Sequence, residues 1–590
     1  MLMLILLAAV NAKYIHSNPA LYLLKAYADK ERTRRGLSGP SPVRVPEYTI
    51  NMPREAILEA VLSQKPDVLI FSCYIWNREM IGSLLDDLFQ VRPELPVFLG
   101  GPEATYDAEG FLENYPSVRA VMVGEGEGTF ADLVTFLETG SGSLSAIPGL
   151  CLRREEASGR AEEEAFSKEP AAFRTGERPL LSMDDIPFPY ADLTSFEDRI
   201  IYYESSRGCP YRCAYCLSSV EKKVRFRSLD LVKAELSFFL EKRVRQVKFI
   251  DRTFNADPKR CREIWHFLRE NDNGLTNFHF EVAGDILTEA EIEEIKGMRP
   301  GLIQLEIGLQ STNEKTLSAV DRRTDLKRLK AAVERIRSFG NVHLHLDLIA
   351  GLPYEDLTSF RKSFHDVYAM RPTQLQLGFL KVLKGSPMET LAKEHDIRSC
   401  RRPPYEVLST PWLTYDNIRE LKAVEDMVER LYNSGQYTVT LPQLENCFEG
   451  PYDLYLSAAG YFRERSGKGK LSRAAFAEAL LDLAVRSAVR GKQTALTEDQ
   501  WRDFFRECLT CDFYLREKGK SRPAFAKDIS AYKKACRSAD EGGRLHVEVL
   551  TWELSGRPKR AERPYLVTFD YEKRDPLTGN ASMARAEIKL

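Results

Sequence analysis

Three cysteines in one short segment constrain this chain more than any other feature of its sequence. Cys209, Cys213 and Cys216 have the spacing C-x3-C-x2-C and follow directly after the strand-like run 200–205. Three thiolates on one loop can hold three irons of a four-iron, four-sulfur ([4Fe-4S]) cluster, and the lack of a fourth nearby ligand leaves one iron open to another molecule. The spacing therefore predicts a cluster-binding loop at the end of a strand, with chemistry that starts at the open iron.

A structural zinc site is the alternative for the same cysteines. Structural zinc takes four ligands, usually as two separated pairs, and no histidine stands close to this loop. The chain has 11 cysteines, an odd number with three in one loop, which does not look like a disulfide framework. The cysteine content therefore favours a cluster over zinc and indicates a reducing cytoplasm.

Size and composition set wide bounds. A chain of 590 residues is expected to contain about three or four domains, and 43% hydrophobic residues are enough to bury several cores. A net charge of -2 gives no overall basic signature for nucleic acid. The apolar start, residues 1–10, lacks the basic flank of a signal peptide and is too short to span a membrane, so we expect a buried strand there and no membrane span.

Residues 1–140 alternate between apolar runs of strand length and helical segments, which predicts a parallel, Rossmann-like sheet covered on both faces. A polar or Gly-rich turn follows each strand. Ligands of open parallel sheets bind outside the carboxyl ends of the strands, so the turns indicate a ligand site. The expected strands are 2–10, 43–51, 67–72, 96–100 and 120–123, the expected helices include 53–63 and 78–90, and the turns are 11–18, 72–77, 100–103 and 124–127.

The rest of the chain divides into three parts. Residues 141–195 are polar and predict a linker that carries a small hairpin. Residues 196–390 alternate again as in a partial (β/α)6 barrel, whose active site would lie at the carboxyl ends of the strands. Residues 391–590 predict a mixed, mainly helical domain with strands near its end. The expected barrel strands after the first are 247–250, 278–282, 303–307, 343–349 and 375–380, the expected C-terminal helices are 417–433 and 474–490, and the expected strands near the end are 547–550 and 566–569.

The cysteine loop, with Tyr215 before its third cysteine, resembles that of the radical S-adenosylmethionine (SAM) superfamily. The N-terminal half is similar to the cobalamin-binding domain of the B12-dependent radical SAM enzymes, in which the turns Gly-Gly-Pro and Gly-Glu-Gly-Glu recur. The resemblance implies three cofactors: a [4Fe-4S] cluster, SAM and cobalamin. The Asp-x-His-x-x-Gly motif that supplies a cobalt ligand in other B12 proteins is absent, and His16 in the first turn lacks its spacing.

The resemblance also implies which residues meet the cobalamin. Trp76 or Tyr74 would lie under the corrin and keep nitrogen ligands off the lower face of cobalt, whereas Ser72 and the Gly100-Gly101 turn would contact the nucleotide tail. For Trp76 the alternative is a core aromatic at the end of a strand. His16 is a cobalt-ligand candidate, and the alternative is a histidine at the surface or in contact with the nucleotide tail. The implied cobalamin-binding residues are Asn11, Tyr14, Ser72, Tyr74, Trp76, Gly100, Gly101, Pro102, Glu103, Gly124 and Glu125.

Residues at the strand ends of the barrel are implied to bind SAM. A carboxylate can accept both ribose hydroxyls, a guanidinium can pair with the methionine carboxylate, and a glycine leaves room for adenine. The alternative for Asp251 and Glu281 is a helix cap or a pair with Arg252, and for Gln310 it is turn chemistry. The implied SAM-binding residues are Tyr215, Asp251, Glu281, Glu306, Gln310, Arg322 and Gly351.

What the resemblance implies is an enzyme that cleaves SAM to a 5'-deoxyadenosyl radical and C-methylates an unactivated carbon through methylcobalamin. Cys209, Cys213, Cys216 and Trp76 would carry the catalysis, and a flavodoxin or ferredoxin would supply electrons. A rearrangement or cyclisation without methyl transfer, and a non-catalytic cluster or corrin sensor, are the alternatives. The substrate stays open.

The C-terminal part resembles the uncharacterised extension of one subfamily of these enzymes, which by analogy helps to define the substrate pocket. Within it, Cys508 and Cys511 form a second C-x2-C pair. A lone pair without adjacent histidine is more often two half-buried helical cysteines than a metal site. We therefore expect no metal there.

Overall fold

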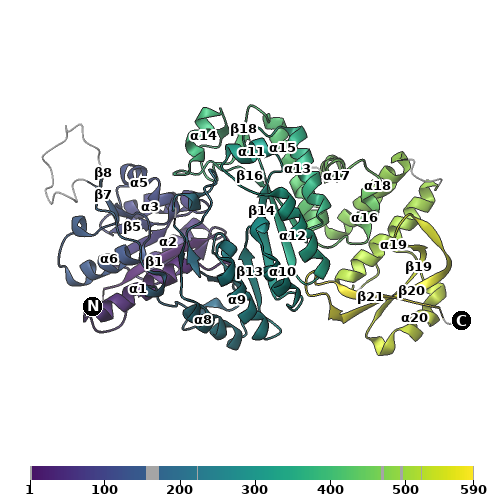
Figure 1. Ribbon diagram of the computed structural model, residues 1–590, viewed down its shortest axis with the longest axis horizontal. Helices are drawn as coiled ribbons and strands as arrows, with labels where there is room; N and C mark the ends of the chain where they lie inside the picture. The colour runs from purple at the N-terminus through teal and green to yellow at the C-terminus, as the bar shows by residue number, and fades with distance from the viewer. Residues whose placement is uncertain are drawn as a thin grey trace. The chain divides into compact units, whose positions relative to one another are not determined.

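The computed structural model describes all residues except 1–2, 154–171, 222, 467–470, 492–495, 520 and 589–590. The described chain divides into two compact units (Figure 1). Unit 1 comprises residues 1–281, 320–322 and 381–407, and unit 2 comprises residues 282–319, 323–380 and 408–590.

The N-terminal part of unit 1 is an eight-stranded sheet with β1 (Ile5–Asn11) in its interior. Residues of β1 point alternately into two cores, Leu6, Ala8 and Val10 into one and Ile5, Leu7 and Ala9 into the other, so both faces of the sheet are covered. The strand order is β2-β1-β4-β5-β6-β7-β8, and β3 pairs with β1. The other strands are β2 (Val43–Arg44), β3 (Glu47–Thr49), β4 (Val68–Ser72), β5 (Val97–Gly100), β6 (Val118–Met122), β7 (Leu150–Arg153) and β8 (Ala172–Arg174), and the helices are α1 (Pro19–Arg34), α2 (Arg54–Ser63), α3 (Arg78–Val91), α4 (Pro102–Thr105), α5 (Ala108–Asn114) and α6 (Glu127–Thr139).

Two features of this sheet differ from the expected ones. The strand predicted over 43–51 is two short strands, β2 and β3, because Pro46 between them has no N–H to donate to a ladder. The linker hairpin is part of the sheet, since β7 pairs antiparallel with β6 and β8 with β7. The residues between β7 and β8 lie outside the described part of the chain.

The barrel segment follows the predicted alternation of strands and helices. Unit 1 holds three parallel strands in the order β13-β12-β9, and unit 2 holds three in the order β16-β15-β14. In unit 1 these are β9 (Ile201–Tyr203), β12 (Gln246–Phe249) and β13 (Asn277–Glu281), with helices α8 (Leu229–Glu241) and α9 (Pro258–Glu270). In unit 2 they are β14 (Ile303–Gln310), β15 (His343–Ala350) and β16 (Gln374–Phe379), with helices α10 (Glu289–Lys296), α11 (Glu314–Ala319), α12 (Leu326–Phe339) and α13 (Leu357–Ala369).

The C-terminal part of unit 2 is mainly helical and ends in a three-stranded antiparallel sheet, as the sequence predicts. Cys508 and Cys511 both lie on α19 and are completely buried, and Cys511 packs against Leu550 and Tyr565 of the sheet. The pair therefore belongs to a helix–sheet core. The helices are α15 (Tyr415–Met427), continued by a π-helical segment (Val428–Asn433), α16 (Thr440–Glu445), α17 (Pro451–Ser466), α18 (Arg473–Gly491), α19 (Glu498–Arg516) and α20 (Lys533–Ala539), and the strands are β19 (His546–Glu553), β20 (Lys559–Arg574) and β21 (Ala581–Ala586).

Among the helices of the described chain, none is both long and apolar enough to cross a membrane. This agrees with the expectation for the N-terminal apolar run, which forms the buried strand β1.

Asp512 on α19 gives the C-terminal part a testable pH dependence. Its carboxylate accepts hydrogen bonds from the backbone N–H groups of Val439 (2.7 Å) and Thr440 (2.8 Å), and burial raises its pKa from 3.8 to about 7. Because the native state then binds a proton that the unfolded chain has lost, stability falls as the pH rises from about 4 to 7, by roughly 4 kcal/mol at most.

We expect the melting temperature of wild type relative to Asp512→Asn to fall as the pH is raised through that window, because the amide does not titrate. Asp499→Asn, at an exposed position on the same helix, is the control and should follow wild type. Parallel pH profiles for wild type and Asp512→Asn would contradict the prediction.

Candidate functional site

The cysteine loop of unit 1 starts and ends at a narrow neck. Here β10 (Ser206–Arg207) pairs antiparallel with β11 (Arg225–Phe226), so that Arg207 lies opposite Arg225. Gly208 has φ +96°, and a Cβ on it would lie 2.4 Å from the carbonyl oxygen of Lys223. Only glycine permits this approach of the two backbones. The neck therefore holds the two ends of the cysteine loop together.

The three cysteines of this loop lie near one another in the fold. Cys213 is buried, Cys209 and Cys216 are half-buried, and the Cys216 N–H donates to the Cys213 carbonyl (3.0 Å). Burial raises the pKa of the Cys209 thiol, and the two other sulfurs add to the rise because they lie close enough to repel a charge on it. The hydroxyl of Thr253 lies 3.4 Å from Cys209 Sγ. Three sulfurs arranged in this way fit the donor set of an iron–sulfur cluster.

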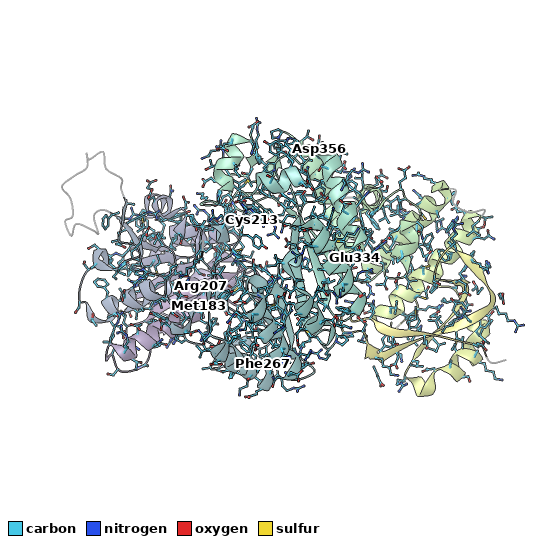
Figure 2. The ribbon with its side chains drawn as sticks, viewed as in Figure 1. Met183, Arg207, Cys213, Phe267, Glu334 and Asp356 are labelled. Atoms are coloured by element: carbon cyan, nitrogen blue, oxygen red, sulfur yellow. The ribbon has the colours of Figure 1, made fainter. Side chains whose placement is uncertain are left out.

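Arg322 stands beside these sulfurs. Its Nη1 lies 3.7 Å from Cys213 Sγ, and its guanidinium lies over the ring of Tyr211, 5.3 Å from the centroid (Cys213 is labelled in Figure 2). Ala214 of the loop donates to the Val320 carbonyl (2.9 Å), which fixes the segment that carries Arg322. A guanidinium here stabilises thiolates and can also pair with a carboxylate. Tyr215 is half-buried on the same loop, and burial raises its pKa.

Asp251, at the end of β12, holds the start of the cysteine loop. It is 1% exposed, and its two oxygens accept from the Ser205 N–H (2.9 Å), the Ser205 hydroxyl (2.7 Å) and the Ser206 hydroxyl (2.6 Å). Burial raises its pKa to about 6. These contacts tie β12 to the neck. Oε2 of Glu281, at the end of β13, lies 4.0 Å from Nη1 of Arg252.

Three of the predicted SAM residues belong to unit 2. Glu306 and Gln310 lie on β14, and Gly351 follows β15. Glu306 lies opposite His345 of β15, and one ligand atom each of Glu306, His345 and Asp347 lie within 4.8 Å of one another. Gln310 and Gly351 both have positive φ, +74° and +93°. The sequence prediction missed His345, although the alternation His343-Leu344-His345-Leu346-Asp347 places three polar side chains on one face of the strand.

The ends of β1 and β4 present an exposed aromatic surface. The rings of Tyr74 and Trp76 stack with centroids 4.4 Å apart and an interplanar angle of 9°, and Trp76 Nε1 donates to the Val10 carbonyl (3.2 Å). Trp76 is 43% exposed and Tyr14, in the preceding turn, 65%. Trp76 is therefore not a core side chain. Burial of its hydroxyl raises the pKa of Tyr74 to about 12, so this tyrosine stays neutral. The surface is thus aromatic, and the guanidinium of Arg199 lies over the ring of Tyr14, 4.7 Å from its centroid.

Asn77, which the sequence prediction did not single out, fixes the turn that carries this aromatic pair. It is 1% exposed, its Nδ2 donates to the carbonyls of Val10 and Ser72 (both 2.9 Å), and its Oδ1 accepts from the Tyr74 N–H (2.7 Å). One amide therefore joins β1, β4 and the turn. Its sequence signal is an amide directly before α3, which by itself suggests only a helix cap.

A polar network lies behind the aromatic pair. Ser72 Oγ accepts from Asn18 (3.0 Å), and Asn11 donates to Glu47 (3.1 Å) and to the His16 carbonyl (3.0 Å). His16 Nδ1 lies 2.6 Å from the Tyr202 hydroxyl on β9, and burial lowers the pKa of the histidine. One of the two ring nitrogens of His16 is thus bonded within the protein.

The two glycine-rich turns have different surroundings. A Cβ on Gly101, which has φ +94°, would lie 2.6 Å from the Cys73 carbonyl, so the approach of the chain's own backbone requires this glycine. Glu103, next to Pro102 at the start of α4, accepts from the Tyr405 hydroxyl (2.8 Å). Around the Cβ position of Gly124, in contrast, no atom lies within 4 Å. Glu125 is paired with Arg207 (3.3 Å) and Arg225. Gly100, at the end of β5, has the side chain of Met122 as its neighbour.

Three family models match successive parts of the chain. The B12 binding domain matches residues 5–134, the radical SAM superfamily matches residues 203–367, and a family described as a protein of unknown function (DUF4080) matches residues 393–560. The sheet with the aromatic surface, the cysteine loop and the C-terminal helices thus each correspond to one model.

Similar proteins include methyltransferases. The chain is 26% identical over 477 residues to the cobalamin-dependent radical SAM methyltransferase TokK of Streptomyces tokunonensis, which covers 76% of the chain and 65% of that protein. It is 30% identical over 270 residues to an uncharacterised methyltransferase of Pyrococcus horikoshii, and this match covers 44% of the chain and 54% of that protein. The chain thus spans less than two thirds of the length of these relatives.

One solved structure similar in fold is the radical SAM methyltransferase TsrM of Kitasatospora setae with cobalamin and a [4Fe-4S] cluster bound. The TM-score is 0.56 at 14% identity, over 87% of the chain and 99% of that protein.

Replacing Asn77 tests how the aromatic surface is held. We expect Asn77→Ala to lower the free energy of unfolding by roughly 2–4 kcal/mol, because it leaves the buried Tyr74 N–H without a partner and removes donors from two carbonyls. The measurement is denaturant unfolding followed by tryptophan fluorescence. Asn51→Ala, at an exposed turn position, is the control and should change stability little. Equal stabilities of the two variants would show that Asn77 does not hold the turn.

Proposed function

As a radical SAM protein with a B12-binding domain, this chain belongs to the cobalamin-dependent radical SAM enzymes, and we propose that it cleaves SAM reductively and methylates an unactivated carbon of its substrate. Its cofactors on this proposal are a [4Fe-4S] cluster, SAM and cobalamin. When bound, the cluster supplies the electron for SAM cleavage and the corrin carries the methyl group.

The observation that carries the proposal is the arrangement around Cys209, Cys213 and Cys216 in unit 1. The three cysteines lie near one another, and the guanidinium of Arg322 lies 3.7 Å from Cys213 Sγ. Three ligands leave one iron of the cluster open, and a cation at its edge suits the methionine carboxylate of SAM. We assign this carboxylate to Arg322.

Other residues are predicted to bind SAM. The geometry supports a positioning role for Asp251, because its oxygens serve Ser205 and Ser206 at the neck. The remaining positions are carried over from the family resemblance and stay predictions. They are Tyr215, Glu281, Glu306, Gln310 and Gly351, to which the structure adds His345 and Asp347 as neighbours of Glu306.

For cobalamin, we assign the lower face of the corrin to the stacked pair Tyr74 and Trp76, and the contact of Tyr14 stays a prediction. A corrin ring can bury the exposed part of the indole, and neither a phenol nor an indole ring offers a nitrogen lone pair to the metal. The Nε1 of Trp76 is used by the Val10 carbonyl, so the indole is held in one orientation. The positions assigned to the nucleotide tail, Ser72 and the turn 100–103, stay predictions.

An electron donor and a reducing compartment complete the proposal. We propose a reducing cytoplasm as the compartment, in which a flavodoxin or ferredoxin reduces the cluster.

Reductive cleavage of SAM tests the proposed activity. Protein purified without oxygen, reconstituted with iron, sulfide and cobalamin and reduced should release 5'-deoxyadenosine from SAM, and label from the SAM methyl group should appear in the corrin fraction. Replacing Cys209, Cys213 and Cys216 together by alanine should abolish both. Cys400→Ala, a half-buried cysteine outside the loop, is the matched control. An intact cluster without 5'-deoxyadenosine would favour a sensor, and release of 5'-deoxyadenosine without label on the corrin would favour a non-methylating reaction.

Trp76 tests the cobalamin surface separately. We expect Trp76→Ala to weaken cobalamin binding roughly tenfold to a hundredfold, because the buried indole area is lost, and Trp76→Phe to retain most of the affinity. Equilibrium dialysis of the cofactor measures this. Phe89→Ala, another exposed aromatic of the same domain, is the control. Equal affinity of Trp76→Ala and wild type would reject the assignment.

A further inference from the structure

The turn Gly124-Glu125-Gly126-Glu127 of the cobalamin domain lies against the neck of the cysteine loop. Glu125 forms a close ion pair with Arg225 of β11 and a second one with Arg207 of β10 (3.3 Å). Glu127, the first residue of α6, binds Arg207 at 2.8 Å. Because Arg207 and Arg225 face each other across the two strands, a single carboxylate bridges both strands of the neck. Arg207, labelled in Figure 2, directly precedes the loop glycine Gly208.

The two arginines of the neck also have acceptors outside the turn 124–127. Arg207 also binds Glu204 (2.7 Å), and Arg225 binds Glu221 (2.9 Å) and donates to the Leu181 carbonyl (2.5 Å). The side chains of the two arginines are 15% and 12% exposed and that of Glu127 is 6% exposed. Each guanidinium therefore has several acceptors in a largely buried site.

Such a network of buried ion pairs specifies the position of the turn 124–127 on the neck more than it adds to the free energy of folding. Burying charges costs desolvation that their attraction roughly repays, so the net gain is small, but removing one partner leaves an uncompensated charge. Guanidinium–carboxylate pairs are also directional, because the donors of arginine form a rigid fork. The turn can therefore sit on the neck in one position only.

We propose that Glu125 and Glu127 are positioning residues that dock the cobalamin domain on the neck of the cluster loop and thereby fix the distance between cluster and corrin. This rests on the proposed function, in which both cofactors bind. It replaces the role in cobalamin contact that the family resemblance gave Glu125, while Gly124 keeps open space around it. Methyl transfer needs both cofactors to act on one substrate, so a fixed separation serves the reaction directly.

The distance itself is the decisive measurement. In the reduced holoenzyme the cluster and cob(II)alamin are both paramagnetic, and pulsed dipolar electron paramagnetic resonance gives their distance distribution. We expect a narrow distribution in wild type and a broader one in the double variant Glu125→Gln, Glu127→Gln, with unchanged iron and cobalamin content. Glu59→Gln, an exposed glutamate of the same domain, is the control and should match wild type.

Hydrogen exchange of the protein without cofactors gives a second, independent readout. Amides of 125–128, 205–207 and 225–227 should exchange roughly tenfold faster or more in the double variant, whereas β1 should be unaffected. If the double variant does not fold, Glu125→Gln alone is measured in the same way.

Unchanged distances and unchanged exchange would overturn the proposal, and so would a loss of cobalamin affinity without a change in exchange, which would return Glu125 to the cofactor site. Wild type that binds no cluster or no cobalamin would instead reject the proposed function, and the exchange experiment would still decide whether the docking contact exists.

Discussion

The contact of two backbones at Gly208 and Lys223 is the constraint on which the cofactor-bearing part of this protein depends. It closes the cysteine loop into a ring whose ends are paired as β10 and β11. Two further contacts hold the chain on either side of this closed loop. Asp251 holds Ser205 and Ser206 on one side, and Ala214 is bound to the Val320 carbonyl on the other, which brings Arg322 to Cys213. A side chain larger than hydrogen at residue 208 would separate the two ends.

The aromatic surface at the ends of β1 and β4 follows a different principle, in which polar residues lie behind the rings. Asn77 and the Val10 carbonyl fix the turn that carries Trp76 and Tyr74. Nδ1 of His16, in the first turn, is bonded to the Tyr202 hydroxyl. The position of the aromatic pair is thus set by hydrogen bonds of its own turn and of the strand next to it.

Features that depend on residues close together in the sequence could be predicted from it. The apolar run that forms β1, the barrel strands and the cysteine spacing were all visible, because each depends on neighbours within a few residues. The break at Pro46 was missed, although a proline within a strand-like segment is itself a signal for a break. Asn77 was missed because its partners lie on two strands. The turn 124–127 was predicted to meet a ligand, but its acidic residues bind Arg207 and Arg225, whose sequence separation of 80 to 100 residues leaves no local signal.

The cysteine loop and the aromatic pair both belong to unit 1, whereas the C-terminal helices and sheet belong to unit 2. The C-terminal helices and sheet thus share a compact unit with the barrel strands β14, β15 and β16. Substitutions in the C-terminal segment therefore fall in the unit that also holds half of the barrel strands, and not in the unit that holds the cysteines.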